Sequence, residues 1–115
     1  MANAADPKQV NYSRRKARRR EENYLAALRG ALGTVGGRLV FAHLLERAGI
    51  FESSFHSDSN VMAFNEGRRA TGLRLLEDIT QAAPTLYDTL EAERRARYEA
   101  DRREVQAVEQ TAQED

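Results

Sequence analysis

The chain has 115 residues, a net charge of zero and no cysteine. This length fits a single domain, and without cysteine the chain has neither disulfides nor thiolate metal sites. No apolar run approaches the roughly 20 residues that cross a bilayer, and the N-terminus lacks the apolar segment of a secretory signal. We therefore expect a soluble, intracellular protein with no membrane span.

The charges are distributed unevenly along the chain. Residues 1–20 contain seven basic residues and one acidic residue, whereas residues 85–115 contain nine acidic and five basic residues. All the phenylalanines and both histidines lie between these ends, in residues 36–79. A core of that size is marginal by itself and is usually stabilised by a partner or by oligomerisation. We expect a homo-oligomer, in which one copy's basic end could pair with a neighbour's acidic end, each surface pair contributing at most about 1 kcal/mol.

Residues 1–12 are polar and show no periodicity, and we expect a flexible arm there. A helix is predicted over residues 13–33, beginning near Asn11 or Ser13, which are both good caps. Its first half is basic, and its second half carries an apolar stripe at helical spacing, formed by Tyr24, Leu25, Leu28 and Leu32.

Residues 34–83 are predicted to form the core domain, with helices over about 37–48 and 59–82. Gly49 is expected to end the first of these helices in the left-handed conformation. Two aromatic residues of the connector, Phe51 and Phe55, are expected to pin it against the helices. In the first of these helices, the apolar face is expected to comprise Leu39, Val40, Leu44 and Ala48, widened by Phe41 and Leu45. In the second, the expected buried set is Met62, Phe64, Leu73, Leu76 and Ile79. Gly67 and Gly72 predict close approach of another segment, since each glycine costs about 1 kcal/mol inside a helix.

Residues 84–115 are predicted to form a long charged helix and tail that starts at Pro84. Pairs of opposite charge at helical spacing, Glu91–Arg95 and Glu99–Arg103, are expected to stabilise it. Leu86, Leu90 and Tyr98 are a weak candidate for an oligomer seam. The predicted fold is therefore all-α, a small helical core flanked by two charged helices.

The strongest electrostatic feature is a basic run formed by Arg14, Arg15, Lys16, Arg18, Arg19 and Arg20. Basic residues near a helix N-terminus oppose the helix dipole, so the run does not serve to stabilise the helix. We favour docking onto an acidic protein surface. Phosphate contact with DNA and a simply solvated helix start remain open.

Nothing in the sequence predicts catalysis, a metal site or a cofactor. His43 and His56 lie at unrelated positions without cysteine, and a metal site needs three or four ligands. The serines of residues 53–57 lack the strained turn of a nucleophile. We therefore expect a protein that is not an enzyme.

A spaced set of residues carries a family resemblance: Gly37, Arg38, Phe41, Gly49, Phe51, Phe55, Asn65, Glu66, Gly67, Arg68, Arg69 and Gly72. This pattern resembles a family of short proteins of tailed bacteriophages, first noticed in a short-tailed Bordetella phage. The resemblance implies a virion component and no reaction. We expect structural roles for its polar residues: Arg68 or Arg69 paired with Glu46 or Glu66, and Asn65 bonded to the connector backbone.

The sequence thus predicts a structural component of a tailed-phage virion, made in the host cytoplasm and present in several copies. Its expected partners are portal or inner-core proteins and further copies of itself. The alternative is a small nucleic-acid-binding phage protein that uses the arginine-rich helix.

Overall fold

The computed structural model describes residues 6–114 of the chain. Four α-helices follow one another, α1 (Pro7–Leu32), α2 (Val35–Arg47), α3 (Ser59–Ala82) and α4 (Pro84–Glu114). No β-strand occurs in this range, and the predicted all-α class is confirmed.

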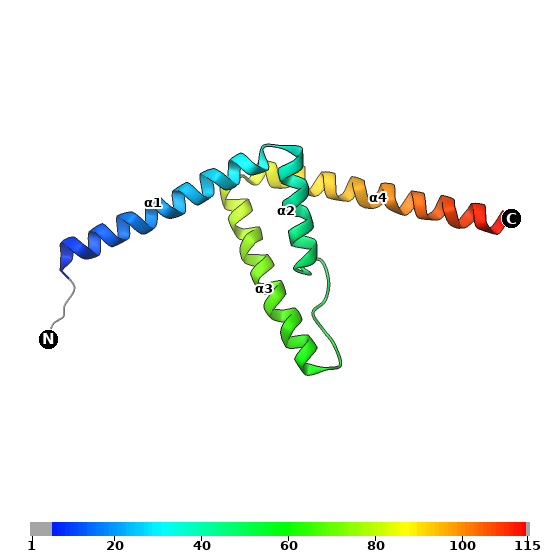
Figure 1. Ribbon diagram of the computed structural model, residues 1–115, viewed down its shortest axis with the longest axis horizontal. Coiled ribbons are helices and arrows are strands. Elements are labelled where there is room, and N and C mark those ends of the chain that lie inside the picture. The colour runs from blue at the N-terminus through cyan, green and yellow to red at the C-terminus, as the bar shows by residue number, and fades with distance from the viewer. Residues whose placement is uncertain (1–5, 115) are drawn as a thin grey trace.

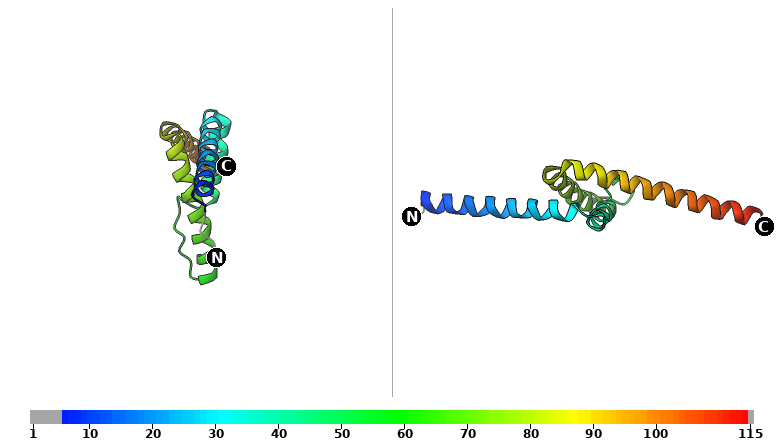
Figure 2. Two further views of the ribbon diagram at one scale, coloured as in Figure 1. Left: turned by 90° about the vertical axis from the view of Figure 1, so that its left-hand side faces the viewer. Right: turned by 90° about the horizontal axis from the view of Figure 1, so that it is seen from above.

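The molecule is extended and thin. Figure 1 shows α2 and α3 side by side as a stem, while α1 and α4 meet at the top of the stem and project to opposite sides. The view from above in Figure 2 shows the same two helices pointing away from each other. The principal extents are 82 × 39 × 15 Å and the radius of gyration is 21.1 Å, against about 13 Å for a compact domain of this length.

The first helix begins earlier than predicted. It starts at Pro7 rather than near Asn11 or Ser13, because Asp6 caps it: the carboxylate accepts a hydrogen bond from the Lys8 backbone N–H at 3.0 Å. Proline suits the first turn because its missing N–H would have no partner there. The predicted arm is therefore helical from Pro7 onward, and residues 1–5 lie outside the described part.

Several predicted helix ends are confirmed. Gly49 has φ +75° and follows α2 in the left-handed region, which a Cβ would disfavour. Asp58 caps α3 by accepting from two backbone N–H groups, and Pro84 opens α4. A single residue, Ala83, separates α3 from α4, so these two long helices meet at a tight corner.

The core lies where the four helices converge. Its buried apolar side chains are Leu28, Leu32, Ala42, Leu45, Ile50, Ile79, Ala82, Ala83 and Leu90. Each helix contributes at least one of them, so no helix buries its apolar face without the other three. Only the second half of α1 and the first half of α4 take part.

The predicted apolar face of α2 is confirmed only in part: Leu45 is buried, and Phe41 and Ala48 pack against the core. Leu39, Val40 and Leu44 are 47%, 55% and 42% exposed, whereas Ala42 and Leu45 are buried. The start of α2 packs closely against the end of α1. At Gly37, a Cβ would overlap the backbone carbonyl of Ala31 in α1.

Two aromatic residues that were predicted to pack, one pinning the connector and one in the core, are also exposed. Phe55 in the connector is 77% exposed and Phe64 in α3 is 68% exposed. Neither belongs to the core cluster, since Phe55 lies in the connector and Phe64 in the first part of α3, away from the junction of the four helices. Instead, Ile50 is the connector residue that enters the core.

The two glycines inside α3 differ. A Cβ on Gly72 would meet the Cβ of Ala48 and lie 2.7 Å from Cγ2 of Ile50, so the predicted close approach is confirmed there, with these two residues as the neighbours. At Gly67 nothing lies within 4 Å of a Cβ, and the prediction is wrong.

By length and composition, none of the single helices in residues 6–114 qualifies as a membrane span, and one bent pair, α1 with α2, passes the same test across a 109° bend.

Candidate functional site

The basic half of α1 (residues 7–23) projects from the core, and its charged groups have no ion-pair partner among the described residues 6–114. Every residue from Asn11 to Tyr24 is exposed. All six predicted contact residues lie on this segment, namely Arg14, Arg15, Lys16, Arg18, Arg19 and Arg20. None of them forms an ion pair within residues 6–114, so their charges are available to another molecule.

The outer half of α4 (residues 98–114) projects on the other side and is also exposed throughout. Its apolar residues Tyr98, Val105 and Val108 are 63%, 56% and 65% exposed. Leu90, in the inner half of α4, is completely buried. The candidate seam of Leu86, Leu90 and Tyr98 is therefore divided between the chain's own core and its surface.

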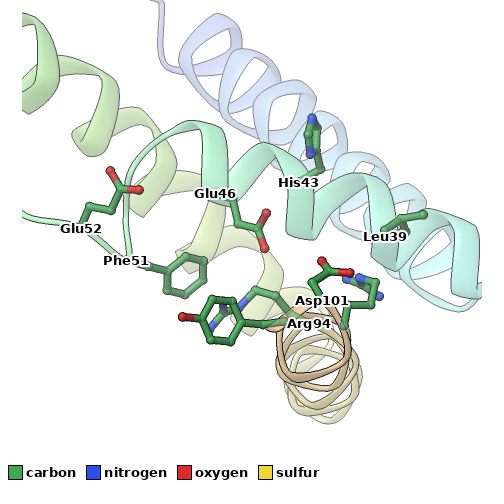
Figure 3. Close-up of a pocket in the computed structure, with 9 residues that line it drawn as sticks. Leu39, His43, Glu46, Phe51, Glu52, Arg94 and Asp101 are labelled. Atoms are coloured by element: carbon green, nitrogen blue, oxygen red, sulfur yellow. The ribbon is translucent and has the colours of Figure 1, made fainter. Parts of the chain in front are cut away.

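A groove of about 620 Å³ separates α2 and the connector from α4. Its lining comprises Leu39, His43, Glu46, Phe51, Glu52, Arg94, Arg97, Tyr98 and Asp101. Figure 3 shows Glu46 of α2, Phe51 of the connector and Arg94 of α4 facing the same space. The mixture of charged and apolar groups suits a protein side chain better than a small apolar ligand.

Arg94 lines this groove and contacts both the connector and its own helix, α4. Its guanidinium lies 3.9 Å from the centroid of the Phe51 ring, a cation–π contact. It also donates two hydrogen bonds to the Glu91 carboxylate, at 3.0 and 2.8 Å. Those bonds hold the pKa of Glu91 below its ordinary value and raise the pKa of Arg94. The cation–π contact therefore holds Phe51 against α4. Glu91 also accepts from Arg95 at 3.1 Å, and this confirms the predicted Glu91–Arg95 pair.

Arg38 joins three helices at the opposite end of α2. Its Nε donates to the Glu93 carboxylate in α4 at 2.6 Å, and its Nη1 donates to the carbonyl of Leu32 at the end of α1 at 2.9 Å. The Arg38 side chain is 11% exposed. The planar guanidinium satisfies both acceptors at once, so Arg38 has a structural role.

The remaining polar residues of the motif surround the connector. Asn65 donates to the carbonyl of Ser54 at 3.4 Å, as predicted, and the Ser54 hydroxyl donates to Glu66. The predicted ion pairs of Arg68 and Arg69 do not form in residues 6–114. Arg68 instead lies over the Phe64 ring at 5.9 Å, beside Gly49.

Tyr24 connects α1 to α3. Its hydroxyl donates to the Asp78 carboxylate at 2.7 Å. Burial, the hydrogen bond to Asp78 and the negative charge nearby raise the pKa of Tyr24 to about 12. Arg29 adds a second link by donating from Nε to the carbonyl of Ala82 at 2.8 Å.

The two histidines are not brought together with other ligands. His43 lies on the exposed side of α2, and the Nδ1 of His56 accepts from the backbone N–H of Asp58 at 2.9 Å. Among residues 6–114, no group of three or more His, Asp or Glu side chains is arranged to hold a metal ion. The predicted Glu99–Arg103 pair is likewise not formed there.

Sequence reasoning missed the exposed apolar side of α2, because it assigned those residues to the core. Leu39, Val40 and Leu44 form this side, with Val35 64% exposed near the start of the helix. It also missed Arg38–Glu93 and Arg94–Phe51. Arg38 was noted only through the family pattern, and Phe51 was expected to pin the connector without a named partner. No local spacing predicts contacts between residues this far apart in sequence.

A family model described as Bbp19-like phage protein matches residues 28–92. No curated protein and no solved structure matches the chain. All the buried apolar side chains, from Leu28 to Leu90, lie within the matched range, whereas the exposed halves of α1 and α4 lie outside it. The match spans more than half of the 115 residues, and the chain therefore belongs to the family of Bbp19-like phage proteins.

Proposed function

We propose that the protein is a non-enzymatic structural component of a tailed-phage virion. In this role it binds portal proteins, inner-core proteins or neighbouring subunits through its projecting charged helices. Membership of a phage protein family supports the phage setting. The observation that carries the structural role is the large share of the chain that leaves the core.

The solvent-accessible surface area shows how much of the chain lies outside a compact core. The molecule exposes 8877 Å², against about 6,300 Å² for a compact monomer of 13.0 kDa. Long helices without internal contacts are poor scaffolds for a reaction centre, which needs rigidly held groups. They are well suited to contacts with neighbours in an assembly.

Quantitative mass spectrometry of purified, salt-washed particles tests the proposal. The protein should be present in a fixed ratio to the capsid protein in independent preparations. Presence in infected cells but absence from washed particles would contradict a virion role.

The exposed basic half of α1 favours one competing function, binding of nucleic acid. That function requires an affinity for DNA whose logarithm falls with the logarithm of salt concentration, with a slope of several units. Replacing Arg14, Arg15, Arg18, Arg19 and Arg20 with Gln in one variant should then abolish binding. Arg47 and Arg74, which are exposed on α2 and α3, provide a control variant in which both are replaced with Gln.

A further inference from the structure

Two projecting helical segments carry opposite charge, and neither packs against another helix in the part of the chain that the structure describes. In α1, residues 8–20 contain seven basic and no acidic residues. In α4, residues 99–114 contain five acidic residues against Arg102 and Arg103, and residues 104–114 contain no basic residue. Each segment therefore has the charge that the other lacks.

The outer half of α4 also has the shape of a docking surface for a helix. Tyr98, Val105 and Val108 recur at spacings of seven and three, which place them on one side of the helix. One shallow hollow on this side, beside Val105, shares Tyr98 and Asp101 with the groove between α2 and α4. At 100° per residue, Glu104 and Glu109 flank the apolar stripe on its two sides.

The basic half of α1 presents a matching face. Val10 and Ala17 are seven residues apart and lie on one side of the helix, and the small side chain at Ala17 permits close approach. Arg14 and Arg20 flank this side. Residues 7–23 of α1 and residues 98–114 of α4 are each about 25 Å long.

The two halves cannot meet within one copy. Figures 1 and 2 show α1 and α4 pointing in opposite directions from the core. The partner of each half must therefore be another molecule, and a second copy supplies both the charge and the length.

We propose that the basic half of α1 in one copy packs along the outer half of α4 in a second copy, with Val10 and Ala17 against the Tyr98–Val105–Val108 stripe. The inference rests on the proposed function for the presence of several copies in one place. Exposed ion pairs are individually weak and are screened by salt. The contact is therefore weak between two copies and gains strength when each copy uses both of its helical halves.

Charge reversal in the full-length protein tests the contact by sedimentation velocity over a range of concentrations. Arg14→Glu with Arg20→Glu, or Glu104→Lys with Glu109→Lys, should each weaken self-association by about tenfold or more. Combining all four substitutions exchanges the charges of the two halves and should restore most of the association. The control for the α1 variant, Arg47→Glu with Arg74→Glu, makes the same change in net charge as that variant at exposed sites elsewhere and should leave association unchanged.

A wild-type protein that stays monomeric at all concentrations and low salt would overturn the proposal. The proposal would also be overturned if reversing the charges of α1 alone or of α4 alone left self-association unchanged. The same holds if the variant with all four substitutions did not regain self-association although circular dichroism showed that it was fully helical. DNA or another acidic protein would then be the partner of α1. None of these results bears on whether the protein is found in washed particles, so this inference and the virion role fail separately.

Cross-linking locates the contact independently, because the natural chain has no cysteine. A tagged Ala17→Cys chain mixed with an untagged Val105→Cys chain should give a tagged–untagged disulfide dimer on mild oxidation. A Thr71→Cys chain, altered at an exposed site on α3, replaces the Val105→Cys chain as the control. Equal yields from the two mixtures would contradict the proposed contact.

Discussion

The packed centre of this molecule and its two projecting helical halves differ in what determines their residues. At the centre, four helices share one small apolar cluster. Gly37 lies against the backbone of Ala31 and Gly72 lies against the side chains of Ala48 and Ile50, so a larger residue would not fit at either position. Residues 7–23 and 98–114 are mostly exposed in the described part of the chain, and charged residues dominate them. The family match covers the centre and omits the halves. The centre therefore defines the fold, while the halves are free to differ in what they bind.

The largest contrast between these regions should come from truncating one apolar side chain in each. Leu45→Ala removes a completely buried side chain and should lower the free energy of unfolding by about 2–5 kcal/mol. Val108→Ala, at a residue 65% exposed, should change it by less than about 0.5 kcal/mol. Urea denaturation followed by circular dichroism measures both, and equal losses would show that α4 packs along its whole length.

Arg38, which is largely buried at the centre, and Arg95, which is exposed on α4, extend the comparison to charged residues. Arg38→Ala leaves Glu93 and the Leu32 carbonyl without their donor in a partly buried site, and should cost about 2 kcal/mol. Arg38→Lys should recover little of this, because lysine lacks the planar fork. Arg95→Ala, at a side chain 75% exposed, should cost about 0.5 kcal/mol or less. Thermal unfolding at matched pH ranks the three, and a full recovery in the lysine variant would contradict the assigned role.

The two glycines of α3 test how far the tight packing extends. Gly72→Ala forces a methyl group against Ala48 and Ile50 and should destabilise the fold by about 1–2 kcal/mol. Gly67→Ala meets nothing and should stabilise it by up to about 1 kcal/mol, since alanine is the better helix former. Chemical denaturation should therefore give opposite signs for the same substitution within one helix, and matching signs would refute the close approach.

The smallest effect concerns the junction of the centre with the basic half of α1. Because the pKa of Tyr24 rises from 10.0 to about 12 on folding, its stabilising contribution is complete below pH 10 and is lost between pH 10 and 12. Tyr24→Phe should cost about 1 kcal/mol or less at pH 8, and its difference from wild type should shrink by pH 11.5. Tyr12→Phe, at an exposed residue, is the matched control in urea denaturation. A difference that stays constant with pH would exclude the contribution of Asp78.

Local chemistry made most of the secondary structure predictable. Asp58, Pro84 and Gly49 each act through the few residues beside them, and the helix ends that they set are confirmed. The start of α1 was missed because Asp6–Pro7, an equally good start, lies in a stretch without apolar periodicity.

The packing was harder to predict, for a physical reason. The apolar residues of α2 surround much of the helix, and the predicted face placed Leu39, Val40 and Leu44 at the core together with Leu45. The structure buries Ala42 and Leu45, because the closeness of the neighbouring backbones decides which side of the helix is covered. Periodicity within a single helix gives no information about that closeness.

The candidate surfaces divide in the same way. The basic run was identifiable from sequence, because charge density needs no fold to be recognised. The groove was not identifiable, since it depends on Phe51 in the connector meeting Arg94 in α4. Arg38 was noted through the family pattern, but its partner Glu93 is 55 residues away.

Because only Ala83 separates α3 from α4, a small change of angle at this junction moves the far end of α4 by a large distance. The 31 residues of α4 extend for about 46 Å, so a tilt of about 10° at this elbow would move the far tip by roughly 8 Å. The elbow is fixed by buried Ala82 and Ala83 and by the hydrogen bond from Arg29. Substitutions at these few sites would change the direction in which the end of α4 points. They would thereby alter the curvature of any assembly without changing a residue that contacts a neighbouring molecule.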